Sequence, residues 1–219
     1  MLHQQSKQDQ IGATALRKSG RATRQASEAT VRRIVEVAAL LFVEKGYGVS
    51  MDQIAASASV GKQTLYRRFG SKEALFLAVI DREVQRLAAA ARFEAAKGAG
   101  PLDALKECCR FLLDFMLHPD MVRLHRIFAA EAERFPNIGA YLENCMAPFI
   151  AVLQRLMWSA TAAGHLRKFG SGVLVTHLEG AIVGWPIRQA MLGLDPLAEP
   201  AARDAYFETA WDLFLGGAE

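Results

Sequence analysis

The chain has 219 residues, 52% of them hydrophobic and only seven proline, which is enough apolar material for one large or two small helical domains. It contains no apolar run of the roughly 18 residues that a membrane span requires, no apolar signal segment at its start, and too few cysteines for a disulfide framework or a zinc site. The net charge of +3 is uneven, because residues 1–72 have twelve Lys and Arg against five Asp and Glu, whereas residues 73–219 have fourteen against eighteen.

These features predict a cytoplasmic, all-α protein without a metal or other cofactor and without a membrane partner. The basic front and acidic rear indicate that nucleic acid contacts the front only. The alternative is a solvated polar segment that binds nothing.

Residues 1–26 are polar and show little periodicity, so we expect a flexible tail. Its basic residues are suited to follow phosphates or to enter a minor groove, although a leader without a role remains the alternative. These residues are Arg17, Lys18, Arg21 and Arg24.

The first predicted helix runs from about Ser27 to Lys45, with Gly46 as its left-handed stop. Its apolar residues recur at the helical spacing of three and four, which predicts one buried face. They are Val31, Ile34, Val35, Ala38, Leu41 and Phe42.

Residues 51–71 contain two short helical patterns separated by Ala58-Ser59-Val60-Gly61. Ser50 and Gln53 form an S-x-x-Q capping pair before the first pattern. In the second, from Lys62 to Phe69, Leu65 and Phe69 share one face, which we expect to be core. Because Gln63 and Arg67 point away from that face, the pattern is typical of a helix-turn-helix that places polar side chains in a DNA major groove.

A further helix is predicted from Ser71, the N-cap, towards Ala91, with Lys72 placed to meet a phosphate and with Lys97-Gly98-Ala99-Gly100 as a hinge. The ordered set RRIVEVAALLFVEKGYGVSMDQIAASASVGKQTLYRRFGSKEALF, roughly residues 30–80, resembles the DNA-binding domain of TetR/AcrR transcriptional regulators.

The resemblance implies a role for each matching residue. Tyr66 and Lys72 match a tyrosine and a lysine that contact phosphates, Ser50 matches a phosphate contact, and Thr64 matches a contact to backbone or base. Lys62, Gln63 and Arg67 match positions that vary between family members and that tend to contact bases. Gly61 departs from the usual Ser, and Arg68 stands where His or Tyr is common.

Behind this domain we expect helices over Pro101–Leu117, Pro119–Phe135 and Gly139–Ala163. The segments HPDMVRLHRIFAAEAERFPNIGAYLENC and AGHLRKF are similar to the ligand-binding half of the AefR-like branch, which implies a small-molecule pocket. Candidate lining residues are aromatic, sulfur-containing or histidine side chains at helical spacing, although such a stripe is also typical of core. They are Phe111, Phe115, His125, Phe128, Phe149, Met157 and His177.

Cys108 and Cys109 raise a redox-sensor hypothesis, which we disfavour because buried cysteines usually act as small hydrophobes. The last two helices are predicted over Val173–Gln189, with a kink or shift at Pro186, and over Pro200–Leu215, and they have small and aromatic residues suited to close pairing. The resemblance implies that they form the interface of a homodimer, which would place two recognition helices on a palindrome.

We therefore predict a flexible tail (1–26), a helix-turn-helix domain (27–75) and a helical ligand-binding and dimerisation domain (76–219). The expected function is a non-enzymatic regulator, a repressor that binds a double-stranded DNA operator and is released by a small apolar or amphipathic effector. The alternatives are an activator or ligand-independent regulator, or an all-α binding protein that does not bind DNA. No motif for catalysis is present.

Overall fold

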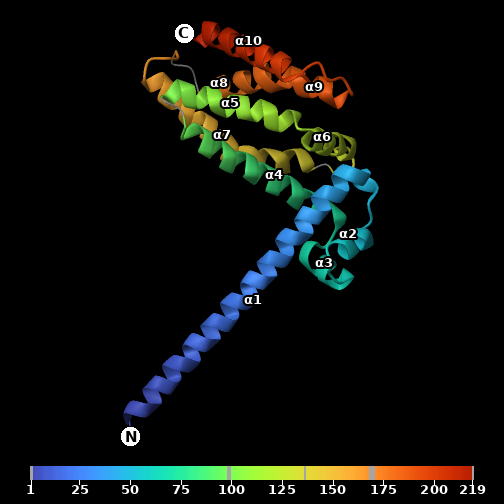
Figure 1. Ribbon diagram of the computed structural model, residues 1–219, viewed down its shortest axis with the longest axis vertical. Coiled ribbons are helices and arrows are strands. Elements are labelled where there is room, and N and C mark those ends of the chain that lie inside the picture. Colours follow the sequence, from blue (N-terminus) through green and yellow to red (C-terminus); the bar gives the residue numbers. More distant parts are fainter. Residues whose placement is uncertain (1, 98–99, 136, 168–170, 219) are drawn as a thin grey trace. The chain divides into compact units, whose positions relative to one another are not determined.

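The computed structural model describes the backbone of residues 2–97, 100–135, 137–167 and 171–218, and side chains within these ranges from Arg24 to Gly217 except Ser171. All regular structure in these ranges is helical, which confirms the predicted fold class (Figure 1). The helices are α1 (Leu2–Lys45), a 3-10 turn (Gly46–Gly48), α2 (Met51–Ser57), α3 (Lys62–Phe69), α4 (Lys72–Ala95), α5 (Pro101–Leu117), α6 (Pro119–Glu131), α7 (Ile138–Ala162), α8 (Ser171–Glu179), a π turn (Gly180–Gly184), α9 (Trp185–Met191) and α10 (Pro200–Ala218).

The chain forms two compact units, Met1–Val79 and Ile80–Glu219. The division falls inside α4, a few residues beyond the predicted boundary at residue 75. Part of the predicted hinge, Gly98 and Ala99, lies outside the described residues.

In the first unit, α1 begins at Leu2, so the predicted start of the first helix at about Ser27 is wrong. The physical reason is composition, since residues 2–26 have no proline and are rich in Gln, Ala, Arg and Leu, which favour helix. The core of the unit packs α1 against α2, α3 and the start of α4, and the predicted apolar face of α1 is buried except for the half-buried Val31. Leu65 is fully buried, while Phe69 is half-buried.

In the second unit, α5 contacts both α7 and α10, and α8 contacts α7. The core side chains come mainly from these helices and from the second half of α4. Several predicted ends shift slightly: α10 ends at Ala218 instead of Leu215, α6 ends at Glu131 instead of Phe135, and α7 spans Ile138–Ala162 instead of Gly139–Ala163. Asn137 is its N-cap, and Gly164 adopts the left-handed φ of 83° beyond its end.

Ion pairs join α5 to α10 along their polar sides. Lys106 Nζ lies 2.6 Å from Glu208 Oε2, Arg110 pairs with both Glu208 and Asp204, and Arg203 lies 3.0 Å from Asp114. The hydrogen bond from Lys106, followed by the attraction of Lys106 and Arg110, lowers the pKa of Glu208.

Because this pKa is lower in the folded than in the unfolded chain, the Glu208 pairs stabilise the protein above the ordinary glutamate pKa of about 4.3. That stabilisation is lost as the pH falls through the lower folded-state value. We expect Glu208→Gln to cost a few tenths to about 1 kcal/mol at pH 7, since solvent screens a side chain that is 43% exposed. Thermal melts from pH 7 to 3 should show the difference from wild type vanish in acid. The control is Glu107→Gln, which neutralises an exposed glutamate of α5 and should match the stability of wild type at every pH. If the stability difference of Glu208→Gln persisted in acid, the ion pairs of Glu208 would not be its cause.

The helix predicted over Val173–Gln189, with a kink or shift at Pro186, is interrupted by the π turn Gly180–Gly184 just before that proline. Proline has no N–H to donate to the carbonyl of Ile182, four residues earlier, so α-helical bonding fails at this turn. The wider π turn accommodates that loss, and π turns occur mostly as single insertions inside α-helices. Glu179 immediately precedes the π turn, and Ile182 and Val183 within it are buried.

Candidate nucleic-acid interface and effector cavity

The α2–α3 pair is built as the sequence predicts. Ser50 accepts a hydrogen bond from the Gln53 N–H (3.2 Å), and Gln53 Oε1 accepts one from the Ser50 N–H (2.9 Å), which completes the capping box. The connection reverses through Ser59, whose φ of 52° is left-handed, and Val60 N–H donates to Ala55 at 3.0 Å. α3 starts at Lys62 and ends at Phe69, followed by Gly70 with a φ of 72°.

The outer face of α3 is polar and accessible. Gln63 and Arg67 are exposed, Tyr66 is 41% exposed, and Thr64 is half-buried. No hydrogen bond or ion pair joins the side chains of Gln63 and Arg67 to another residue of the described ranges, so both are available to a ligand of this face.

Lys62, at the start of α3, has a partner within the protein. Its ammonium lies 2.9 Å from the carboxylate of Asp52 on α2, and this hydrogen bond raises the pKa of Lys62. Both side chains are about 60% exposed (60% and 61%), so water screens the pair and it adds little stability. To contact a base, the Lys62 ammonium would therefore have to leave the Asp52 carboxylate.

Lys72 begins α4 above an aromatic cluster of the first unit. Its Nζ lies 4.3 Å from the ring centroid of Tyr47, a cation–π geometry. Tyr47 stacks on Phe42 at 5.8 Å and meets Phe76 edge to face at 5.5 Å. The Ser71 hydroxyl accepts from the Ala74 N–H at 3.1 Å, so the predicted N-cap of α4 is confirmed. The Tyr47 ring therefore contacts the ammonium group of the side chain that the sequence predicted as a phosphate contact.

Two further basic residues contact α1. Arg68 donates a hydrogen bond to Ser27, which gives a structural role to the residue that departs from the TetR pattern. Arg24 pairs with Glu28 at 3.1 Å, while the side chains of Arg17, Lys18 and Arg21 lie outside the described residues.

The second unit contains a cavity of about 260 Å³ between α4, α5, α6, α7 and the end of α8. Its walls are aliphatic, aromatic and thioether side chains, together with three ionisable residues, Glu83, His125 and Glu179. Apolar walls with a few polar groups are typical of small-molecule sites. The apolar lining residues are Ile80, Val84, Leu87, Phe115, Met116, Met121, Leu124, Phe128, Leu142 and Met146.

The ionisable groups of the cavity differ in their partners. Glu83 is 6% exposed and pairs with Arg82 and Arg86, both at 2.8 Å. His125 Nδ1 lies 2.8 Å from the Met121 carbonyl, and burial lowers the pKa of His125, so the neutral ring donates through Nδ1 and keeps an acceptor at Nε2. Burial raises the pKa of Glu179, which has no hydrogen bond or ion pair to another described residue.

The predicted pocket residues separate into three groups. Phe115, His125 and Phe128 line the cavity. Phe149 and Met157 are fully buried in the core, and Phe111 packs against that core beside Phe115, so these three side chains do not line the cavity. His177 lies on the other side of α8, because it is two residues, roughly 200° of helical rotation, from Glu179.

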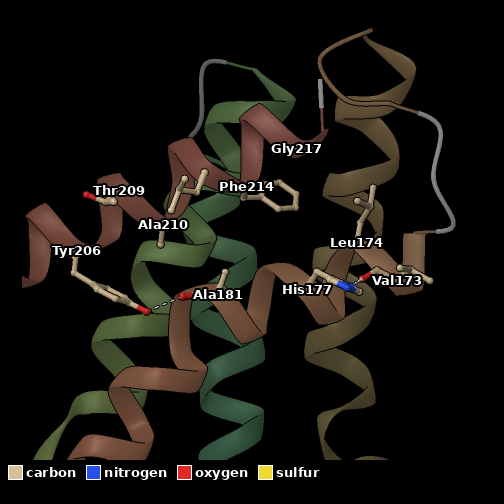
Figure 2. A pocket seen from close by; sticks show the side chains of 10 residues that line it. Val173, Leu174, His177, Ala181, Tyr206, Thr209, Ala210, Phe214 and Gly217 are labelled. Atoms are coloured by element: carbon tan, nitrogen blue, oxygen red, sulfur yellow. Dashed lines mark hydrogen bonds between the residues drawn. The ribbon is translucent and has the colours of Figure 1, made fainter.

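His177 instead lines an open groove of about 610 Å³ between α8, the π turn and α10. Figure 2 shows its imidazole beside Val173, whose carbonyl lies 2.8 Å from Nδ1, and Tyr206 donating to the Ala181 carbonyl at 2.7 Å. The groove is mostly apolar and leaves Leu213 74% and Val173 58% exposed.

Comparison with known proteins decides the family. Residues 34–79 match the description "Bacterial regulatory proteins, tetR family", and residues 103–217 match "AefR-like transcriptional repressor, C-terminal domain". The chain belongs to the TetR family. It is a TetR-family transcriptional regulator with an N-terminal helix-turn-helix domain, and members of this family bind DNA and small molecules and are dimeric.

Individual relatives agree with this assignment. The chain is 31% identical over 169 residues to the HTH-type transcriptional repressor NicS of Pseudomonas putida, covering 74% of this chain and 75% of NicS. A TetR-family regulator from Mesorhizobium loti has the same fold, with a TM-score of 0.79 at 23% identity, over 87% of this chain and 97% of that one. The Flavonoid-responsive Regulator FrrA gives 0.65 at 28% identity, over 88% and 98%.

The chain spans about half the length of two further curated relatives, 51% of one and 48% of the other. One of these is named an activator and the other a repressor, so the sign of regulation is not a property of the family as a whole.

The helices described for this TetR-family chain include none long and apolar enough to cross a membrane.

In the second unit of this TetR-family protein, Cys108 and Cys109 are core residues. Burial raises the pKa of Cys108 to about 12 and that of Cys109 well above its usual value, so both stay as unreactive thiols. This agrees with the preference for a packing role.

Tyr47 was not among the predicted site residues of this TetR-family chain, and its effect on Lys72 is testable. We expect Tyr47→Leu to weaken DNA binding by roughly two- to five-fold, since a cation–π contact of about 0.5–1 kcal/mol no longer restrains the ammonium. Tyr47→Phe retains the ring face and should stay closer to wild type. Fluorescence anisotropy on labelled DNA measures both, and thermal melts show whether each variant is folded. Equal losses of DNA affinity in both variants would show that the ring face of Tyr47 does not position Lys72.

Proposed function

We propose that the protein is a homodimeric repressor in the cytoplasm that binds a palindromic DNA operator and releases it when a small apolar or amphipathic effector occupies the cavity. It would act by binding alone, without catalysis. The observation that supports ligand control is the cavity itself, whose apolar walls contain a few ionisable groups. The exposed polar face of α3 supports DNA recognition.

The proposed mechanism is a shift between two populations. The effector must prefer the state that does not bind DNA, since a ligand with equal affinity for both states shifts nothing. α4 provides covalent continuity, because this one helix begins at Lys72 and contributes Ile80, Glu83, Val84 and Leu87 to the cavity.

Dimerisation is assigned to the groove between α8 and α10. A self-complementary face built about a two-fold axis needs exposed apolar side chains, and this groove has them in Val173 and Leu213. We expect Leu213→Glu to yield a monomer in sedimentation velocity and to lose most operator affinity. Leu40→Glu is the matched control, an exposed leucine (67%) of the first unit, and should remain a dimer. A dimeric Leu213→Glu variant would refute this assignment.

The DNA-binding proposal is tested with the promoter region of its own gene in a gel-shift assay. We expect affinity to fall steeply with salt, because Lys and Arg displace counterions from phosphates. Binding that does not respond to salt, or no binding by the folded dimer, would refute it.

Activation is the second candidate, favoured by one observation, the curated relative that is named an activator. A reporter gene behind the bound promoter decides between them: transcription rises on deletion of the regulator if it represses and falls if it activates.

A further inference from the structure

The polar lining of the cavity consists of hydrogen-bond acceptors. Glu83 and Glu179 present carboxylates, and His125 keeps its Nδ1 proton on the Met121 carbonyl, which leaves Nε2 as an acceptor. The remaining lining residues have apolar or thioether side chains, so none of the lining side chains of this cavity is a Lys, Arg, Asn, Gln or hydroxyl donor.

The two carboxylates are not equivalent. The charge of Glu83 is matched by Arg82 and Arg86, each at 2.8 Å. Glu179 comes from the end of α8, directly before the π turn, and is paired with no other described residue. Glu179 is half-buried, and a carboxylate that is partly removed from water without a partner is costly, so a cation is the ligand that removes this cost.

We infer that the effector is a small amphipathic amine whose ammonium group pairs with Glu179 and whose apolar body lies among Phe115, Phe128 and the methionines of the cavity. This deepens the proposed function, since it names the chemistry of the effector. Aromatic faces also attract cations, and thioethers adapt to apolar ligands of different shape. The volume of about 260 Å³ lies just below the usual range of about 300–1,000 Å³ for ligand pockets and restricts the ligand to a small molecule.

A carboxylate ligand would meet the unmatched like charge of Glu179 and no donor from the lining side chains. A neutral alcohol would have an acceptor partner but no charge to match Glu179. The three chemistries therefore predict different orders of affinity for molecules of one size.

Three probes of nearly equal size test the inference: 2-phenylethylamine, 2-phenylethanol and phenylacetate. Isothermal titration calorimetry on the full chain, in phosphate buffer at pH 7.5, should show tightest binding for the amine and weakest for phenylacetate. Glu179→Gln keeps the side-chain shape and removes the charge, and should weaken amine binding by roughly ten- to hundred-fold while leaving 2-phenylethanol unchanged. Glu143→Gln, an exposed neutralisation on α7, should bind the amine as wild type does.

Equal or tighter binding of the alcohol or of phenylacetate by the wild-type protein overturns the inference, and so does amine binding that Glu179→Gln does not change. Failure of the folded wild-type protein to bind the amine at millimolar concentration overturns it as well. The wild-type series stands even if Glu179→Gln does not fold. A gel shift without any amine reports on the proposed DNA binding alone, so the two proposals fail separately.

Discussion

Replacing Lys72 by methionine is expected to weaken binding to every DNA sequence alike, whereas replacing Gln63 or Arg67 by alanine should change which sequence is preferred. Lys72 is proposed to meet a phosphate, which has no sequence information, and its loss should lower the salt slope by about one. The amide of Gln63 is suited to an adenine edge and the guanidinium of Arg67 to a guanine edge. Replacing either residue by alanine should therefore reduce the free energy of operator binding by about 1–3 kcal/mol. Tyr66→Phe, which removes only a hydroxyl, should, like the Lys72 variant, weaken binding to every DNA sequence alike.

Fluorescence anisotropy with the operator and with a shuffled duplex, at several salt concentrations, measures both effects. Arg92→Met, which removes an exposed charge from the second unit, is the control and should leave affinity and salt slope near wild type. If the Lys72 and Arg67 variants lose the same affinity on both duplexes, the assignment of phosphate and base contacts is wrong.

Phe207→Ala should destabilise the second unit by about 3–5 kcal/mol, because it empties a fully buried site. The ring lies 6.3 Å from Trp211 in a stacked arrangement, and the Arg110 guanidinium lies 4.3 Å above it. We expect the thermal midpoint to fall by roughly 10 °C. Differential scanning calorimetry measures the change.

Phe93→Ala removes the same ring from α4 where it is 64% exposed, and should change stability by no more than about 0.5 kcal/mol. Phe207→Leu keeps most of the side-chain volume, so its loss of stability should lie between those of Phe207→Ala and Phe93→Ala. A Phe207→Ala variant as stable as the Phe93→Ala variant would show that α10 contributes little to this core.

Local signals were sufficient where a helix has its own start and stop residues. α3 and α5 have their predicted bounds, because Gly61 and Gly70 flank the first and Pro101 occupies the first turn of the second. The Ser50–Gln53 box was likewise predictable from spacing alone. α1 was not, since a start at Ser27 rested on a change in polarity, and polar residues with high helix propensity extend a helix without any apolar face.

The cavity was only partly predictable, for a different reason. Helical periodicity identifies the buried face of a helix, but not the points where neighbouring helices separate enough to leave space. Phe149 and Phe115 are alike in sequence, yet one fills the core and the other faces the cavity. Glu83 and Glu179 were missed. For Glu179 the signal is an isolated glutamate within the apolar run Leu178-Glu179-Gly180-Ala181-Ile182, whereas Glu83 lies in a charged stretch that gives no such signal.

The π turn absorbs one extra residue in its segment. A turn bonded from i to i+5 contains one residue more than the α-helical turn it replaces, so each of its residues rotates the chain by less than the roughly 100° of an α-helical residue. If the same residues were wound as α-helix throughout, α9 would be turned by roughly 100° relative to α8. The Ala190 and Met191 carbonyls that now accept from Arg126, at 2.6 and 3.1 Å, would then face elsewhere. The wider turn therefore sets the angular phase between Glu179 and α9.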